Sequence, residues 1–115
     1  MAFSEIEQKR YEKAVGSYLD SRRPSIEVRD QLDLGYRMDG QAIEIFEIRP
    51  KWNDPSEKME SPIAKVKYYK SRNEWAIYWM KSDLKWHIYE PTTEVKSLEA
   101  FFEVLNEDVY GSFWG

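Results

Sequence analysis

Three runs of alternating apolar and polar residues between Ile63 and Glu90 constrain the fold of this chain more than any other feature. The runs are Ile63–Lys70, Trp75–Lys81 and Leu84–Glu90, and they are rich in the aromatic and β-branched residues that favour strands. The short polar links Ser71-Arg72-Asn73 and Ser82-Asp83 separate the runs. Connections this short join antiparallel neighbours, because a parallel crossover needs a dozen residues or more. The segment is therefore predicted to form a three-stranded antiparallel meander.

The two short links also predict which way the side chains of the meander point. A two-residue turn at Ser82-Asp83 places Trp79 opposite Trp86, and the first link places Tyr68 opposite Trp75. Because side chains alternate between the faces of a strand, these pairings sort the whole sheet. The predicted apolar face holds Ala64, Val66, Tyr68, Trp75, Ile77, Trp79, Trp86 and Ile88. The predicted outer face holds Lys65, Lys67, Tyr69, Tyr78, Lys85, His87 and Tyr89.

A helix is predicted at each end of the chain. Ser4 and Glu7 have the spacing of a capping box, and an apolar stripe at helical spacing continues to Arg22. Ser97 is expected to cap a second helix that extends to about Asp108 and buries leucine and phenylalanine side chains. Two further strands should lie between the first helix and the meander.

These two strands form a predicted hairpin, Leu32–Met38 and Gln41–Arg49, around the turn signal Asp39-Gly40. The following residues, Pro50–Pro62, are polar and contain Trp52, and we interpret them as a long loop that is either functional or mobile. The order helix, hairpin, meander, helix predicts an α+β fold. Its antiparallel sheet has about five strands, with the N-terminal helix and the C-terminal helix packed on it.

Composition narrows the class of protein. The 115 residues suit one domain spanning residues 1–115, and 16% of them are aromatic, which favours a well-filled core. There is no cysteine, so disulfides and thiolate metal sites are excluded, and no cofactor is predicted. The net charge of −4 means that any affinity for a polyanion must come from a local patch. The start lacks the features of a secretory signal and no apolar run is long enough to cross a membrane, so a cytoplasmic location is expected.

Three longer runs resemble a known family. They are Leu32–Arg37, Phe46–Trp52 and Trp79–His87, and the pair Tyr110-Gly111 near the end also fits. Together these residues resemble the bacterial family known as domain of unknown function 3024, and the likeness spans most of the chain. The resemblance implies a bacterial origin, and it implies no activity, ligand or catalytic residue.

The first candidate site is the outer face of the meander. Its lysines, with His87, offer cations for phosphates, and its tyrosines offer rings for stacking, which is the combination found in single-strand nucleic-acid sites. The alternative is an ordinary wet face of an antiparallel sheet, which also carries lysine and tyrosine. The predicted partner is an anionic polymer, such as single-stranded nucleic acid, or another protein.

The second candidate is a metal-dependent nuclease site. Asp33 followed by Glu47-Ile48-Arg49 is similar to the arrangement of acidic and basic residues in restriction-type nucleases, where carboxylates hold a hard cation. The expected hairpin register opposes this interpretation, because Asp33 and Glu47 then point to opposite faces of the sheet. Glu44 shares the face of Asp33, but Phe46 stands where the motif needs a lysine.

The third candidate joins Glu47 and Arg49, which continue the apolar face of the hairpin and should therefore be partly buried and paired. They form either the floor of an anion pocket beneath Trp52 or a structural ion pair that anchors the loop. His87 is the sole histidine and cannot make a zinc site without other ligands of its kind. A last candidate is the aromatic tail from Val109 to Gly115, which is expected to pack on the domain or to form a homodimer.

These patterns favour a non-enzymatic binding module, with the outer face of the meander as its contact surface. One alternative is a nuclease-like enzyme that uses Asp33 with Glu44 or Glu47. Another is a structural protein that associates with itself through the aromatic tail.

Overall fold

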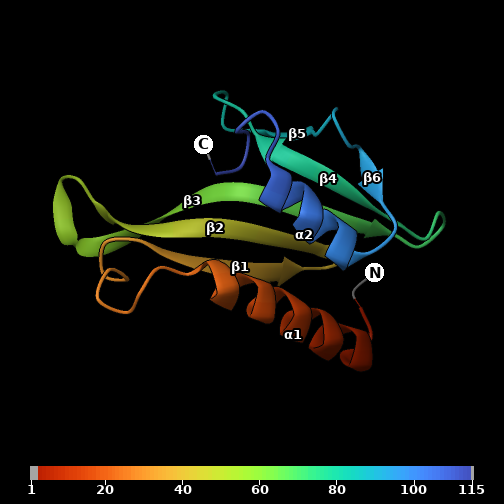
Figure 1. The fold of residues 1–115 in the computed structure, drawn as a ribbon, viewed down its shortest axis with the longest axis horizontal. Coiled ribbons are helices and arrows are strands. Elements are labelled where there is room, and N and C mark those ends of the chain that lie inside the picture. The colour runs from red at the N-terminus through yellow and green to blue at the C-terminus, as the bar shows by residue number, and fades with distance from the viewer. Residues whose placement is uncertain (1–2, 115) are drawn as a thin grey trace.

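An antiparallel sheet and two helices make up the structure, a computed structural model that describes residues 3–114 (Figure 1). The elements in chain order are α1 (Glu5–Arg22), β1 (Asp33–Asp39), β2 (Ala42–Lys51), β3 (Asp54–Tyr69), β4 (Glu74–Met80), β5 (Trp86–Ile88), β6 (Glu94–Val95) and α2 (Leu98–Glu107). The sheet runs β1-β2-β3-β4-β5, and the short β6 pairs with β4 beside β5. The predicted α+β class and the order of the elements are confirmed. None of the described helices is long and apolar enough to span a membrane.

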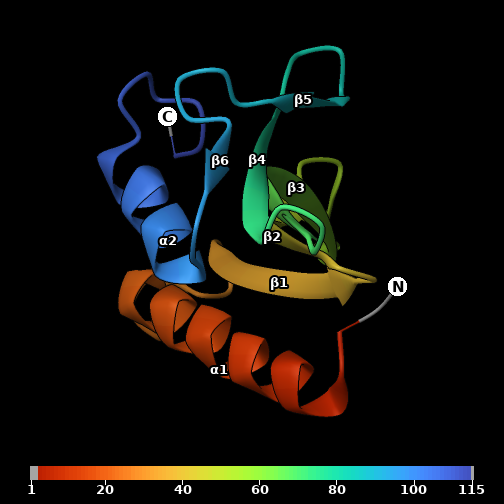
Figure 2. The same ribbon diagram turned by 90° about the vertical axis from the view of Figure 1, so that its right-hand side faces the viewer.

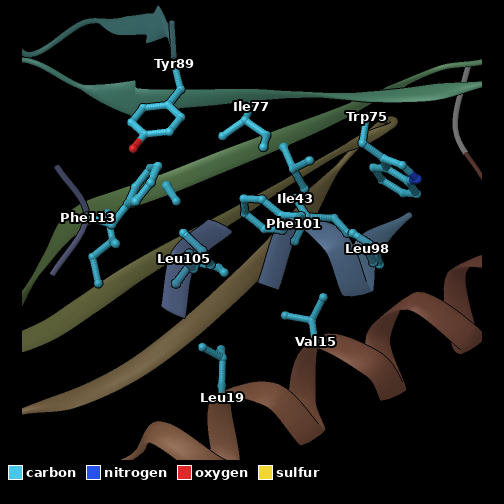
Figure 3. Packing of buried hydrophobic residues seen from close by; sticks show 14 of the residues in the cluster. Val15, Leu19, Ile43, Trp75, Ile77, Tyr89, Leu98, Phe101, Leu105 and Phe113 are labelled. Atoms are coloured by element: carbon cyan, nitrogen blue, oxygen red, sulfur yellow. The ribbon is translucent and has the colours of Figure 1, made fainter. Parts of the chain in front are cut away.

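The first helix begins where its capping box predicts. The Ser4 side chain accepts the backbone N–H of Glu7 at 3.2 Å, and the Glu7 carboxylate accepts the backbone N–H of Ser4 at 3.0 Å. These two bonds satisfy amides that have no partner within the helix. Val15 and Leu19 on the apolar stripe are buried against the sheet and α2 (Figure 3).

The second helix fills the space above the centre of the sheet. Ser97 caps it as predicted by accepting the backbone N–H of Ala100, and Phe101 and Leu105 are fully buried. Figure 3 shows these two side chains between the α1 residues and the sheet residues of the core. Figure 2 shows α1 along β1 and α2 beside β6 and β4. Both helices therefore cover the apolar face of one curved sheet.

The chain after α2 folds back onto the same core. Asp108 ends the helix in the left-handed conformation, and its carboxylate accepts the backbone N–H groups of Phe113 and Trp114 at 3.0 and 2.8 Å. The Phe113 ring is buried 4.8 Å from the ring of Tyr89, and the Trp114 indole N–H donates to the carbonyl of Leu105. The predicted packing of the tail on its own domain is thus found for Phe113 and Trp114, whereas Val109 and Tyr110 are exposed. Gly115 lies outside them.

The hairpin of β1 and β2 differs from its predicted register by two residues. Asp39 pairs with Ala42, so the turn residues are Gly40 and Gln41 rather than Asp39 and Gly40. Gly40 supplies the positive φ of 62° that the turn needs. A shift of two residues leaves every side chain on its predicted face, because the period of a strand is two.

The predicted loop from Pro50 to Pro62 is wrong, because these residues form strands. They belong to β2 and β3, which pair as far as Lys51 and Asp54 and turn at Trp52-Asn53. We name residues 49–60 the arm, since beyond Ile48 the ribbon has no third strand and projects from the domain (Figure 1). The alternation of apolar and polar residues is lost where both faces of a ribbon are exposed to solvent. Proline is tolerated there because the outer edge of the ribbon has no strand to pair with. The sequence of the arm therefore has the composition of a loop.

The predicted register of the meander is correct between β3 and β4 and wrong between β4 and β5. The pairs of β3 with β4, including Tyr68 with Trp75, are those predicted. Between β4 and β5, however, Trp79 pairs with His87 rather than Trp86, because the loop has three residues and Leu84 takes a positive φ of 62°. The backbone N–H of Lys81 donates to the carbonyl of Lys85 across this loop. One extra loop residue reverses the faces of all of β5.

Two glycines provide a test of this packing. A Cβ at Gly35 would lie 2.8 Å from the Phe46 ring on the next strand, whereas a Cβ at Gly16 in α1 would meet nothing within 4 Å. We predict that Gly35→Ala lowers the free energy of unfolding by about 1–2 kcal/mol through overpacking. Gly16→Ala should raise it by about 0.5–1 kcal/mol through helix propensity. Urea unfolding of both variants measures the two changes, and shifts of the same sign would contradict the packing of Phe46 against β1.

Candidate functional site

The sheet has one face that neither helix covers. The core side chains of the sheet pack with the buried stripes of α1 and α2, and the opposite side chains point away from them. We call this second surface the open face. Its central side chains come from three neighbouring strands and are Lys65, Lys67, Tyr69, Tyr78, Met80 and Trp86.

Cations and aromatic rings interleave on the open face. The ammonium nitrogen of Lys65 lies 5.9 Å from the ring centroids of both Tyr78 and Trp86. Tyr69 has Lys67 at 5.3 Å and the guanidinium of Arg72 at 4.4 Å from its ring centroid. Distances of this size are those of cation–π contacts, which hold the long basic side chains along the sheet.

The two tyrosines of the open face are joined through their hydroxyl groups. The oxygens of Tyr69 and Tyr78 are 2.9 Å apart, and one hydroxyl donates to the other. Burial, together with this hydrogen bond, raises the pKa of Tyr78 to about 12. Both rings are half-buried. Tyr78 is therefore neutral at physiological pH, and the hydrogen bond between the two hydroxyl groups holds both rings in place.

A small hollow lies beside Trp86 where the open face reaches β2. It has a volume of about 120 Å³, and Phe46, Pro62 and Trp86 are among its walls. The guanidinium of Arg37 lies 4.6 Å from the Phe46 ring centroid and pairs with Glu60. A bulge in β3 places Pro62 rather than Ile63 opposite Phe46, which brings the proline to this side of the sheet. The hollow can receive one small side chain or ring edge.

Three residues predicted for this surface lie elsewhere. Tyr89 is 2% exposed and packs in the core, and His87 pairs with Trp79 on the core side of β4. The side chain of Lys85, two residues before His87, points to the same side as His87, and its carbonyl accepts the backbone N–H of Lys81. The predicted set Lys65, Lys67, Tyr69, Tyr78, Lys85, His87 and Tyr89 therefore keeps only its first four members. The three-residue loop is the physical reason, because it reverses β5.

The same reversal adds residues that the sequence interpretation missed. Trp86, which the sequence predicts to face the core, instead joins Lys65 on the open face. A signal for the longer loop was present in Asp83, whose carboxylate accepts the backbone N–H of Lys85 at 3.0 Å and contacts the His87 ring nitrogen at 2.8 Å. Aspartate often stabilises such turns through its own side chain. The contact with His87 also lowers the pKa of Asp83.

The charge of the open face is mixed. Within residues 3–114, Lys65 and Lys67 have no carboxylate within ion-pair distance, whereas Arg37 pairs with Glu60 and Arg72 pairs with Glu94. Glu44 lies opposite Lys65 in the register of β2 and β3. Two unpaired lysines are a small patch for a polyanion, because each phosphate contact requires its own cation.

The carboxylates of the nuclease hypothesis do not come together. Asp33 accepts two hydrogen bonds from the Arg23 guanidinium at 2.8 and 2.7 Å. Glu44 pairs across the sheet with Arg37, four residues along β1 from Asp33, and Glu47 points to the other face. No cluster of three or more possible metal ligands occurs within residues 3–114. The geometry thus brings no pair of these three carboxylates to one ion.

The predicted pocket of Glu47, Arg49 and Trp52 is also not formed. Glu47 and Arg49 make an ion pair at 3.0 Å within β2, and because the Arg49 side chain is 53% exposed the pair neither lies in the core nor anchors a loop. Trp52 lies at the turn of the arm and is 91% exposed, so it covers neither Glu47 nor Arg49. The reason is the extended ribbon, which carries Trp52 away from the sheet instead of folding it over.

Fold and surface together define the class of this protein: a small α+β protein whose antiparallel sheet is covered by helices on one face and open on the other. The family model described as "Domain of unknown function (DUF3024)" matches residues 3–115, and the chain belongs to this family. The comparison with curated proteins gives no match, and the comparison with solved structures gives none.

The ion pair of Asp33 with Arg23 makes a pH-dependent prediction. Hydrogen bonds from Arg23 hold the pKa of Asp33 below its usual value. The ion pair therefore contributes its full stabilisation of the folded state above about pH 3.9, the pKa of an aspartate in the unfolded chain. This contribution is lost as the pH falls through the lower pKa that Asp33 has in the folded state. We expect Asp33→Asn to lower the free energy of unfolding by about 1–2 kcal/mol at pH 7, with a smaller loss below about pH 4.

Asp20→Asn is the matched control for this measurement. Asp20 is 73% exposed and lies 3.7 Å from Arg23, so its removal should change the free energy of unfolding by less than about 0.5 kcal/mol. Urea titrations at several pH values compare the two variants. An equal loss for both, or a loss that does not depend on pH for Asp33→Asn, would contradict the assigned role of Asp33.

Proposed function

We propose that this protein is a non-enzymatic module that binds another protein through the open face. The observation that carries the proposal is the composition of that surface. Tyrosine, tryptophan, methionine and arginine are enriched at protein interfaces relative to other surfaces, and the open face combines Tyr69, Tyr78, Met80, Trp86 and Arg72. Charged groups that pair with one another lie toward its edges. Lys65 and Lys67 also lie at its centre, against the aromatic rings, and a polar rim around aromatic side chains is the general pattern of a protein-binding surface.

The contacts that hold these aromatic rings in place also favour protein binding. Binding energy concentrates in a few aromatic and arginine residues that are already well packed, because little conformational entropy is then lost on association. Tyr69 and Tyr78 hold each other through their hydroxyl groups, and Trp86 lies against Lys65. The hollow between Trp86 and Phe46 offers a place for one anchoring side chain of a partner.

Single-stranded nucleic acid is the less favoured partner because of charge. The reversal of β5 turns Lys85 and His87 away from the open face, and Glu44 lies opposite Lys65. With Lys65 and Lys67 as the unpaired cations, about two phosphates can be neutralised, so the logarithm of affinity should fall with that of salt with a slope of only about −1.4. Such binding is weak at physiological salt.

Site-specific photocrosslinking in the native host tests the proposed contact surface. A photoreactive phenylalanine analogue replaces Tyr78 on the open face, and in a matched control it replaces Ile6, which is exposed on α1. We expect a discrete protein adduct from position 78 and none from position 6. Trp86→Ala in the Tyr78 variant should reduce the adduct at least about tenfold, because a central aromatic anchor is lost.

Leu84→Ala serves as the control for that substitution, since Leu84 is exposed at the neighbouring turn and its loss should leave the adduct unchanged. Circular dichroism confirms that each variant stays folded. An adduct that nuclease digests would show that the open face binds a nucleic acid rather than a protein. Either that result or the absence of any adduct at position 78 would overturn the proposal.

A further inference from the structure

The arm ends in an apolar side chain that its own chain does not cover. Trp52 is 91% exposed, the highest exposure among the large hydrophobic side chains of the described residues. It lies at the turn of a ribbon whose residues from Trp52 to Glu60 are all exposed. A two-stranded ribbon alone is only marginally stable in water, and exposed tryptophan is costly unless a partner buries it. Both features point to a contact made by the tip of the arm.

A second, separate feature is an apolar hollow elsewhere on the same chain. A hollow of about 200 Å³ lies beside the end of β5, lined by Trp79, Lys81, Ile88, Tyr89, Glu90, Pro91, Tyr110 and Ser112. Its walls are largely apolar, and Tyr110 at its edge is 74% exposed. We call it the β5 hollow. It is distinct from the smaller hollow of the open face, which lies against β2.

The chemistry of the β5 hollow suits an indole ring. The ring needs apolar walls together with one acceptor for its N–H group, and Glu90 provides a carboxylate among the lining residues. Lys81 provides a cation that already lies 5.4 Å from the ring centroid of Trp79 and can face a second ring. Because Trp52 is so exposed, it does not fill this hollow within its own chain.

We propose that the β5 hollow is the docking site for Trp52 of a second copy of this chain, so that two copies exchange their arms. The same chain carries both the exposed ring and the hollow, and a two-fold pair therefore makes the contact twice. Two inserted indole rings bury less area than a standard interface, so the dimer should be weak and form at high protein concentration. None of the six central side chains of the open face lines the β5 hollow, although Ile88 of the lining lies opposite Tyr78.

Sedimentation equilibrium of the purified full chain tests the pair. From about 10 μM to 1 mM, the range of weak association, we expect the mass to rise toward twice the protomer mass of 13.8 kDa. Trp52→Ala should weaken the dimer at least about tenfold, as should Tyr110→Glu, which puts a charge at the edge of the β5 hollow. Leu84→Ala, which removes another exposed apolar side chain, should leave the dimer unchanged.

Mixing the two weakened variants distinguishes this specific contact from nonspecific association. Trp52→Ala keeps an intact β5 hollow and Tyr110→Glu keeps an intact Trp52, so their mixture can form one of the two contacts. We expect the mixture to associate more strongly than either variant alone. A protomer mass at every concentration, dimerisation of Trp52→Ala like the unchanged chain, or a mass that grows beyond the dimer would each overturn the proposal.

Discussion

The pairing of β3 with a neighbour on each side is the constraint on which the rest of the structure depends. This strand of sixteen residues meets β2 along most of its length and β4 at its inner end. Because its side chains alternate strictly, these two pairings decide which residues face the helices. Ala64 and Val66 enter the core, while Lys65 and Lys67 must then face the other way. The core under the helices and the open face are thus two results of one register.

Small irregularities at the ends of these pairings shape the candidate contact surface. A bulge in β3 turns Pro62 toward Phe46, and the three-residue loop before β5 turns Trp86 toward Lys65. Each device changes the number of backbone residues by one, and each therefore moves side chains to the opposite face. Together they place aromatic surface beside the tyrosine pair and withdraw basic residues, which favours a protein partner over a polyanion.

The two proposed contacts differ in how the fold supports them. The open face lies on strands backed by the full hydrophobic core, so its rings are held in place before any partner arrives. Beyond β1 the arm is held by its own ladder of hydrogen bonds and by a hydrogen bond from the Lys58 ammonium to the carbonyl of Asp30, so its tip is positioned by backbone pairing rather than by packing. The tail contributes differently, because Phe113 and Trp114 complete the core near Tyr89 and leave Tyr110 exposed at the edge of the β5 hollow.

Several features of the fold could be predicted because their causes are local. The cap of α1 by Ser4 and that of α2 by Ser97 follow from side-chain chemistry within one turn of helix. The pairing of Tyr68 with Trp75 follows from a short link between two apolar runs. Four of the predicted surface residues, Lys65, Lys67, Tyr69 and Tyr78, lie on these well-determined strands, and their common face could therefore be assigned correctly.

The features that could not be predicted depend either on contacts between distant parts of the chain or on a loop length that the residue types leave open. The arm has the polar composition of a loop, and only the partner strand shows that it is a ribbon. The faces of β5 depend on whether a loop holds two residues or three, and Leu84 adopts the uncommon backbone conformation of the longer loop.

By itself the sequence determined the helix ends, the order of the elements and the pairing of β3 with β4, because each depends on residues close together in the chain. Only the tertiary structure decided that Trp86 faces outward and Tyr89 inward, because burying Tyr89 against Phe113 joins segments far apart in the sequence.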